Sequence, residues 1–67
     1  MMEVTLNGDA RAVDDGTTVE DVVAGLERGP GGLAVAVNGD VVPRSRWATT
    51  PLSPHDRVEV LTAAQGG

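Results

Sequence analysis

The sequence predicts an α+β fold, in which one helix covers one face of a β-sheet. Two Asn-Gly pairs, Asn7-Gly8 and Asn38-Gly39, each stand between short runs of apolar residues, which is the strongest short-range signal for a β-hairpin. Between these pairs lies one segment whose apolar residues recur at helical spacing. Because one amphipathic helix can cover only one face of a sheet, a two-layer arrangement is the expected solution.

The first hairpin is expected at the start of the chain. Apolar residues alternate with polar ones from Met2 to Leu6, as in a strand with one buried face. After the first Asn-Gly turn, residues 10–13 indicate a weaker return strand, because small and apolar residues dominate there.

One helix is expected between the two hairpins. Its apolar stripe follows the spacing i, i+3, i+4 and i+7 and consists of Val19, Val22, Val23 and Leu26. Thr17 followed by Glu20 matches a capping box, and Gly29 with Pro30 supplies a stop signal. These signals predict a helix of roughly ten residues.

A second hairpin and a final strand complete the expected order. Leu33, Val35 and Val37 face one way in a strand whose other face carries two alanines, and the second Asn-Gly pair leads into a return strand ending at residue 42. Residues 43–56 contain three prolines and no period, so a connecting loop with at most one helical turn is expected. Its Trp47, the one aromatic residue, is expected to close an edge of the core.

The last strand, residues 57–62, places Val58 and Val60 on one face and Leu61 on the other. Its most hydrophobic available partner is the first strand, which would put these two strands at the centre of a mixed sheet of four to five strands. That layout is a ubiquitin-like β-grasp packed on one main helix. We expect residues 1–62 to form this single domain and residues 63–67 to form a flexible C-terminal tail.

Composition narrows the classes of function. A chain of 67 residues closes one small core but does not enclose a deep pocket with its own catalytic shell, so an enzyme acting alone is not expected. Cysteine is absent, which excludes disulfides, thiolate metal sites and a thiol nucleophile. The start of the chain lacks a signal-peptide pattern and no stretch is apolar enough to span a bilayer, so we expect a cytoplasmic, soluble protein without a membrane partner.

Ten acidic residues against five arginines give a net charge of -5. A nucleic-acid partner is therefore disfavoured, because phosphate backbones repel such a surface. The acidity either steers a basic protein partner toward the chain or simply maintains solubility. Lysine is absent as well, so no side-chain amine is available for acylation.

Several residues with possible chemistry have simpler structural interpretations. Four carboxylates stand around the start of the expected helix, where the helix dipole favours them without any catalytic role, namely those of Asp14, Asp15, Glu20 and Asp21. His55 lies in a polar turn, and no second His or Cys completes a zinc site, so no metal is expected. The segment "RGPGGL" has no following lysine and leads into a strand, so no nucleotide or other cofactor is expected. Arg44 and Arg46 either contact a partner or remain solvated.

The end of the chain is the strongest candidate for chemistry. After the last strand come five small or polar residues with no bulky side chain to anchor them: Ala63, Ala64, Gln65, Gly66 and Gly67. Because glycine has no Cβ, Gly66 and Gly67 could pass through a narrow channel and place a terminal carboxylate deep in a partner's site. The alternative is an incidental, poorly ordered end.

Together these segments resemble the ThiS family, the sulfur carrier proteins of thiamine thiazole biosynthesis, over essentially the whole chain. The resemblance rests on "VNGDVVPRSRW", "HDRVEVL" and the final "QGG". Two departures stand out: His55 occupies a position where many members carry glycine, and Ala64 one where a bulkier apolar residue is common.

The resemblance implies a carrier that is a substrate of partner enzymes. A ThiF-like adenylyltransferase using ATP and Mg would adenylate the Gly67 carboxylate, a desulfurase relay would supply persulfide sulfur, and a ThiG-like thiazole synthase would receive it from the Gly67 thiocarboxylate. Gly66 would be the spacer, and residues 63–65 the arm. Val58, Val60 or Leu61 would mark the docking surface. MoaD-like molybdopterin carriers, carriers for cysteine or siderophore assembly, and a non-carrier β-grasp binding module remain alternatives.

Overall fold

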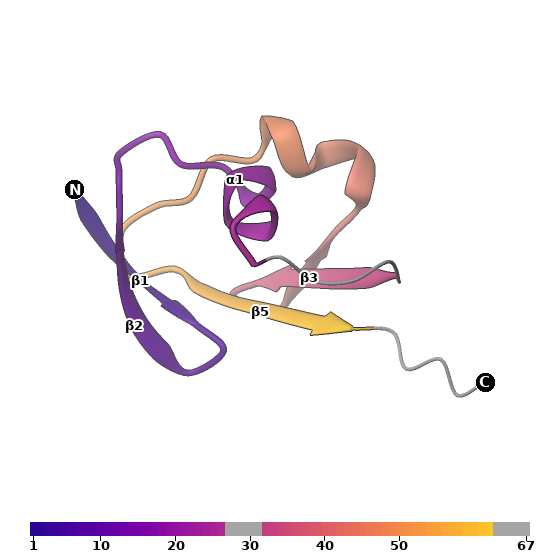
Figure 1. Cartoon of the computed structure of the whole chain (residues 1–67), viewed down its shortest axis with the longest axis horizontal. Helices are drawn as coiled ribbons and strands as arrows, with labels where there is room; N and C mark the ends of the chain where they lie inside the picture. Colours follow the sequence, from indigo (N-terminus) through magenta and orange to yellow (C-terminus); the bar gives the residue numbers. More distant parts are fainter. Residues whose placement is uncertain (27–31, 63–67) are drawn as a thin grey trace.

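The computed structural model describes residues 1–26 and 32–62, and it confirms the predicted ubiquitin-like β-grasp (Figure 1). Within these residues, five strands form one mixed sheet in the order β2-β1-β5-β3-β4. The elements are β1 (Met2–Leu6), β2 (Asp9–Val13), α1 (Val19–Ala24), β3 (Leu33–Val37), β4 (Asp40–Val42), the 3-10 helix η1 (Arg44–Thr49) and β5 (Arg57–Thr62). In the same part of the chain, no helix has the length and hydrophobicity that crossing a membrane requires.

Both Asn-Gly hairpins are confirmed. The φ angles are 50° and 88° at Asn7 and Gly8, and 52° and 89° at Asn38 and Gly39. Positive φ at both central residues is the condition of a type I′ turn, whose twist matches that of the strands it joins. The return strand β2 begins at Asp9, one residue earlier than predicted, because the pairing with β1 continues directly up to the turn.

The first and last strands lie side by side at the centre of the sheet, as predicted. β1 and β5 run parallel, with Thr5 opposite Arg57, while β5 pairs antiparallel with β3 on its other edge. The short β4 closes the far side. β5 therefore has a partner strand on each edge over its first residues, although it is the last element that the structure describes.

Helix α1 starts one residue later than the capping prediction placed it. The cap is Thr18, whose hydroxyl accepts the Asp21 N–H at 3.2 Å while the Asp21 carboxylate accepts the Thr18 N–H at 3.0 Å. The predicted pair, Thr17 and Glu20, was wrong. Thr17 instead ends the preceding turn, because its N–H and hydroxyl both bond to the Asp14 carbonyl.

Contacts with the loop before β5 explain this shift. The Leu52 N–H donates to the Thr17 carbonyl at 2.8 Å, and the Val19 N–H donates to the Thr50 carbonyl at 3.0 Å. These two bonds keep the backbone extended through Thr18, which leaves Thr18 as the first residue able to cap. The helix has six residues instead of roughly ten, and the predicted stop at Gly29-Pro30 lies outside the described residues.

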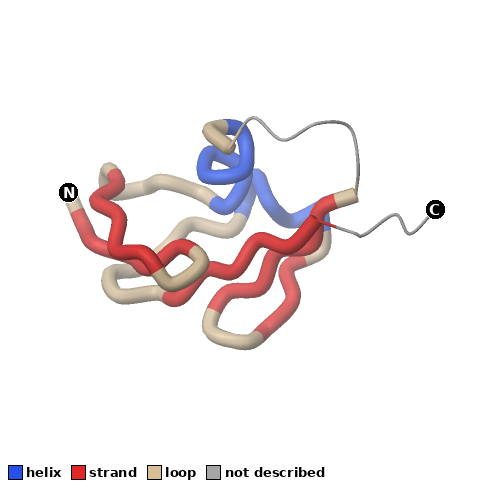
Figure 2. The backbone as a smooth tube through the Cα atoms, turned by 60° about the horizontal axis from the view of Figure 1, so that its bottom comes forward, coloured by secondary structure: helices blue, strands red, loops and turns tan. Residues whose placement is uncertain are grey.

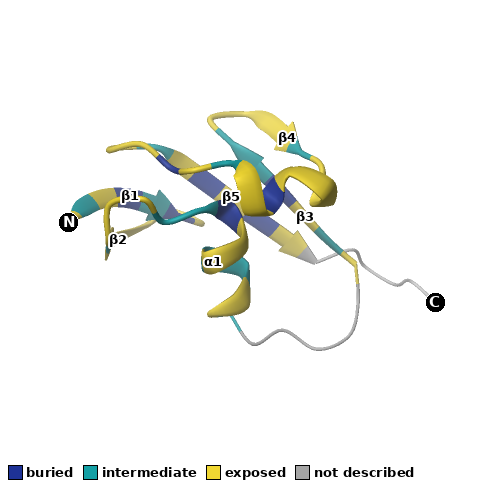
Figure 3. Cartoon of the chain, turned by 90° about the horizontal axis from the view of Figure 1, so that it is seen from above, coloured by how far each residue is buried: buried dark blue, intermediate teal, exposed yellow. Residues whose placement is uncertain are grey.

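The core lies between the sheet and one covering layer made of α1 and η1, which sit on the same side of the strands (Figures 2 and 3). Its buried side chains are Val4, Leu6, Val19, Val35, Trp47, Leu52, Val58 and Val60. The rest of the predicted helical stripe is partly buried against them.

Trp47 confirms its predicted place in the core. The side chain is buried, and its indole N–H donates to the Val42 carbonyl at 2.9 Å, while the Arg44 guanidinium lies 5.2 Å from the ring centre. The loop does carry a short helix, η1, which aims Trp47 inward from its exposed surroundings.

Candidate functional site

The predicted tail lies outside the described residues. This applies to all of its members: Ala63, Ala64, Gln65, Gly66 and Gly67. What the structure describes is the base from which the chain continues to them, namely the end of β5. Thr62, the last described residue, lies opposite Leu33 at the start of β3.

Backbone hydrogen bonds fix β5 from its first residue. The Thr5 N–H donates to the Asp56 carbonyl and the Asn7 N–H to the Val58 carbonyl, both at 2.9 Å. On the other edge, the Asn38 N–H donates to the Arg57 carbonyl at 2.8 Å. Because both edges of the first half of β5 are hydrogen-bonded, this half of the strand resists fraying. It therefore gives the residues that follow β5 a fixed starting point.

The structure identifies which residue of the three proposed for docking is exposed. Val58 and Val60 point into the core, with 1% and 5% of their surface exposed, whereas Leu61 is 65% exposed on the uncovered face of the sheet. Ala34 lies directly opposite Leu61, and Ala36 lies opposite Val41, which is 74% exposed. Facing residues of paired strands share one face.

We call these four residues, Ala34, Ala36, Val41 and Leu61, the outer apolar patch. The uncovered face of a sheet ordinarily carries polar residues, and β1 and the first half of β5 follow that rule with Glu3, Arg57 and Glu59. The outer apolar patch departs from it. Leu61 and Ala34 bring the patch to the end of β5, whereas Ala36 and Val41 lie level with Glu59 in the middle of that strand.

A groove on the opposite face lies between α1 and the β1–β2 hairpin. It has a volume of about 390 Å³ and an apolar floor that includes Val4, Leu6 and Val58, with Asp14 and Asp21 among its lining residues. The side chains near the end of β5 do not line it. The groove and the outer apolar patch are therefore separate surfaces.

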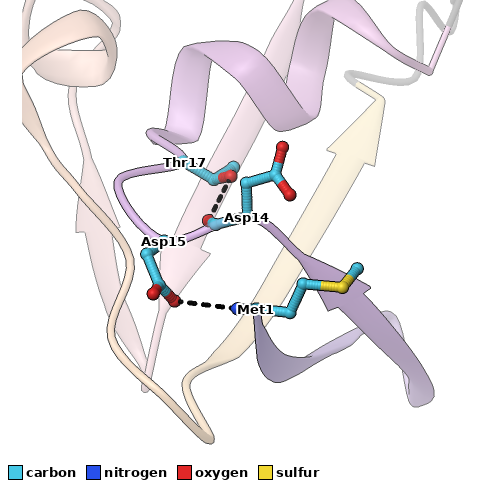
Figure 4. A network of polar contacts seen from close by, with 4 residues as sticks. All are labelled: Met1, Asp14, Asp15 and Thr17. Carbon is cyan, nitrogen blue, oxygen red and sulfur yellow. Dashed lines mark hydrogen bonds and ion pairs between the residues drawn. The ribbon is translucent and has the colours of Figure 1, made fainter.

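Two of the four carboxylates near α1 have partners among the described residues. Asp21 belongs to the capping box, and the Asp15 carboxylate lies 3.5 Å from the Met1 amine (Figure 4). The Asp14 backbone carbonyl accepts the Thr17 hydroxyl bond at 2.6 Å. Among the residues that the structure describes, no three His, Asp or Glu side chains gather in a way that could hold a metal ion.

His55 is an exposed turn residue, as predicted, but its backbone is unusual. Its φ is 71°, in the left-handed region, and its N–H donates to the Glu3 carbonyl at 2.6 Å. The Asp56 carboxylate closes the same turn by accepting the Ser53 N–H at 2.8 Å. Glycine adopts such a φ without a steric cost, so His55 holds backbone strain that a glycine here would avoid.

The sequence reasoning missed a second function of the turn asparagines. The side chains of Asn7 and Asn38 both bond to β5 or the residue just before it, at positions distant in the sequence. The Asn-Gly signal predicts the turns but says nothing about these long-range bonds.

Comparison with known proteins identifies the family. The family model described as "ThiS family" matches residues 4–67. The chain is 29% identical over 66 residues to the sulfur carrier protein ThiS of Escherichia coli K12, and the match covers 98% of this chain and 100% of that protein. A ThiS crystal structure from Geobacter metallireducens, a thiamine biosynthesis protein, superposes with a TM-score of 0.81 at 29% identity, covering 98% of this chain and 100% of the other.

A longer relative also matches. The chain is 35% identical over 66 residues to a thiazole synthase of Magnetococcus marinus, a match that covers 98% of this chain but only 20% of that protein. The chain thus spans a fifth of the length of this relative. The extent of the family match and the shared fold show that the chain belongs to the ThiS family, the sulfur carriers of thiamine biosynthesis.

Proposed function

We propose that Gly67 carries sulfur as a terminal thiocarboxylate and delivers it for thiazole formation. The observation that supports this most directly is the family match, which extends through Gly67 and includes the whole of the E. coli carrier. In this proposal residues 1–62 form the domain that partners recognise. Gly66 is the spacer that enters the partner's site, and Ala63, Ala64 and Gln65 form the arm.

The chemistry requires activation before sulfur transfer. A carboxylate is a resonance-stabilised anion and resists nucleophiles, so a ThiF-like adenylyltransferase would convert it with ATP and Mg to an acyl-adenylate, releasing pyrophosphate. A persulfide from a desulfurase relay would displace AMP and form an acyl disulfide. A second relay thiol then attacks the relay cysteine sulfur, the sulfur of the acyl disulfide that is not bonded to the acyl carbon, which leaves the thiocarboxylate on Gly67 and a disulfide on the relay. ATP is a cytoplasmic reactant, and we place the carrier there.

Composition is consistent with this cycle. The chain has no cysteine, so it offers no side-chain thiol that would hold the sulfur in place of the carboxyl end. It has no lysine, so the activated carboxyl group meets no side-chain amine on another copy of the carrier.

A ThiG-like thiazole synthase is the proposed acceptor. In the Magnetococcus thiazole synthase, a segment similar to this chain is part of the same polypeptide. Carrying both parts on one chain would keep them at a high effective concentration, which supports direct contact between the carrier and the synthase.

The outer apolar patch is the proposed docking surface for the enzyme that takes up the arm. Leu61 and Val41 are large and exposed, and the two alanines between them leave a shallow surface on which a partner's apolar side chains can rest. Apolar patches of this kind on small proteins mark interaction sites. Because the patch adjoins the end of β5, one partner can bind it and receive residues 63–67 at the same time.

The proposal is tested by locating sulfur on the chain. The carrier is incubated with a ThiF-like enzyme, ATP, Mg and a persulfide-loaded relay, then alkylated with iodoacetamide and fragmented in a mass spectrometer. We expect the label on Gly67. Alkylation is needed because replacing oxygen by sulfur adds about 16 Da, the same as oxidising Met1 or Met2.

Two variants serve as controls. Deleting Gly67, or changing Gly66→Val to add a β-branched side chain to the spacer, is expected to abolish labelling. Both should leave the melting temperature nearly unchanged, as expected for residues of the proposed arm. A wild-type chain that stays unlabelled while the relay and the adenylating enzyme are active on another carrier would refute the function.

A further inference from the structure

Asn7 makes two hydrogen bonds that continue the pairing of β1 with β5. The backbone register of these strands covers Thr5 and Leu6 opposite Arg57 and Val58, after which β1 turns away into its hairpin. Beyond this point the Asn7 side chain, not the β1 backbone, bonds to the edge of β5. Its Oδ1 accepts the Val60 N–H at 2.8 Å and its Nδ2 donates to the Val60 carbonyl at 3.3 Å, across 53 residues of sequence.

The carboxamide acts as one more peptide unit. It presents a donor and an acceptor, as a backbone amide does, so it satisfies both polar groups of Val60 at once. An aspartate there would keep the acceptor and lose the donor. Since the opposite edge of β5 pairs with β3 up to Thr62, Asn7 completes the two-sided support of β5 as far as Val60, two residues from the strand end.

Asn38 provides a matched residue at the other end of the same strand. It occupies the same position of the same turn type, with φ of 52° against 50° at Asn7. Its Oδ1 accepts the Arg57 N–H and its Nδ2 donates to the Asp56 carboxylate, both at 2.9 Å. The two asparagines therefore hold opposite halves of β5, and only Asn7 bonds to the half that leads to Gly67.

We infer that Asn7 is a positioning residue of the carrier: by fixing Val60 it sets the orientation in which the chain leaves the sheet toward Gly67. This inference rests on the proposed function of Gly67. A partner bound to the outer apolar patch receives the carboxylate in reacting geometry only if the segment between the patch and Gly67 starts from a fixed point. Small errors of placement at a reacting atom are costly to the rate.

The experiment compares Asn7→Gly with Asn38→Gly. Glycine keeps the positive φ of each turn and removes only the carboxamide. In Asn7→Gly, hydrogen exchange of the Val60 amide should accelerate by about tenfold, as expected for two partly exposed hydrogen bonds. With a ThiF-like enzyme and ATP, kcat for pyrophosphate release should fall by about fivefold to tenfold, while KM for the carrier changes by less than about twofold because the docking patch is intact.

Asn38→Gly is expected to lower the melting temperature about as much as Asn7→Gly does, because each variant loses two side-chain hydrogen bonds to the same part of the fold. It should leave kcat within about twofold of wild type. Asn7→Asp, which keeps the bond to the Val60 N–H, should give an intermediate kcat and supplies a second variant should Asn7→Gly fold poorly. Equal kcat values for the Asn7 and Asn38 variants, with adenylation of the wild type intact, would overturn the inference alone. A wild-type chain that is not adenylated would overturn the proposed function and this inference together.

Discussion

Replacing His55 by glycine is expected to stabilise this protein. His55 adopts a φ of 71°, and a left-handed conformation costs an L-residue about 1 kcal/mol or somewhat more. Glycine avoids that cost but loses about 0.5 kcal/mol through the greater entropy of its unfolded state. The net expectation is a gain of about 0.5 kcal/mol, which for a domain of this size raises the melting temperature by about 2–4 °C.

Other contributions of His55 to the free energy of unfolding are small. The side chain is exposed and makes no hydrogen bond within the described residues, and the backbone bond to the Glu3 carbonyl does not depend on the side chain. The turn itself is closed by Ser53 and Asp56 and remains in the variant.

His55→Ala is the matched control, because it removes the imidazole and keeps a Cβ. It should be less stable than His55→Gly by about 0.5 kcal/mol, since alanine keeps the strain of about 1 kcal/mol at positive φ while glycine loses about 0.5 kcal/mol through the entropy of its unfolded state. Thermal and urea unfolding followed by far-UV circular dichroism would measure the order of the three proteins. If the alanine variant proved as stable as the glycine variant, backbone strain at this turn would not limit the stability of the protein.

Three further predictions concern the core, the helix and the docking surface. Trp47→Phe should lower the free energy of unfolding by about 2 kcal/mol, measured in urea, because it shrinks a buried side chain and leaves the Val42 carbonyl without its indole donor. Thr18→Ala should cost about 1 kcal/mol in the same assay by removing the helix cap, and a negligible loss would contradict the cap assignment. Leu61→Asp should raise KM for the adenylating enzyme at least about tenfold with little change in stability, whereas Ala12→Asp, exposed on an edge strand away from the patch, should leave KM unchanged.

Alternation in the strands predicted which residues share a face but not which face is covered. The alternation of the strand alone assigned Val58 and Val60 to one face of the sheet and Leu61 to the other. That Leu61 is the exposed one depends on where α1 and η1 pack, and this is a property of the whole fold. The sequence therefore offered three candidate residues for the proposed docking surface, and only the structure shows that Leu61 is the exposed one.

The start of α1 is a second feature that the local sequence does not decide. Thr17 and Thr18 are both good caps, and Glu20 and Asp21 are both acidic, so the local pattern fits two registers. Bonds from residues 50–52 to Thr17 and Val19 select the later one. Sequence separation hides these bonds from any reasoning based on neighbouring residues.

The sequence by itself determined the two hairpins, the helical stripe, the burial of Trp47 and the family. Each of these follows from adjacent residues or from a contiguous motif, and a positive φ at Asn-Gly needs no distant partner. Tertiary structure alone decided that the Asn7 carboxamide reaches Val60 and that Leu61 faces outward, because both depend on which segments the folded chain brings together. The residues proposed to carry the chemistry were read from the sequence, while the support for the strand that leads to them became visible only in the fold.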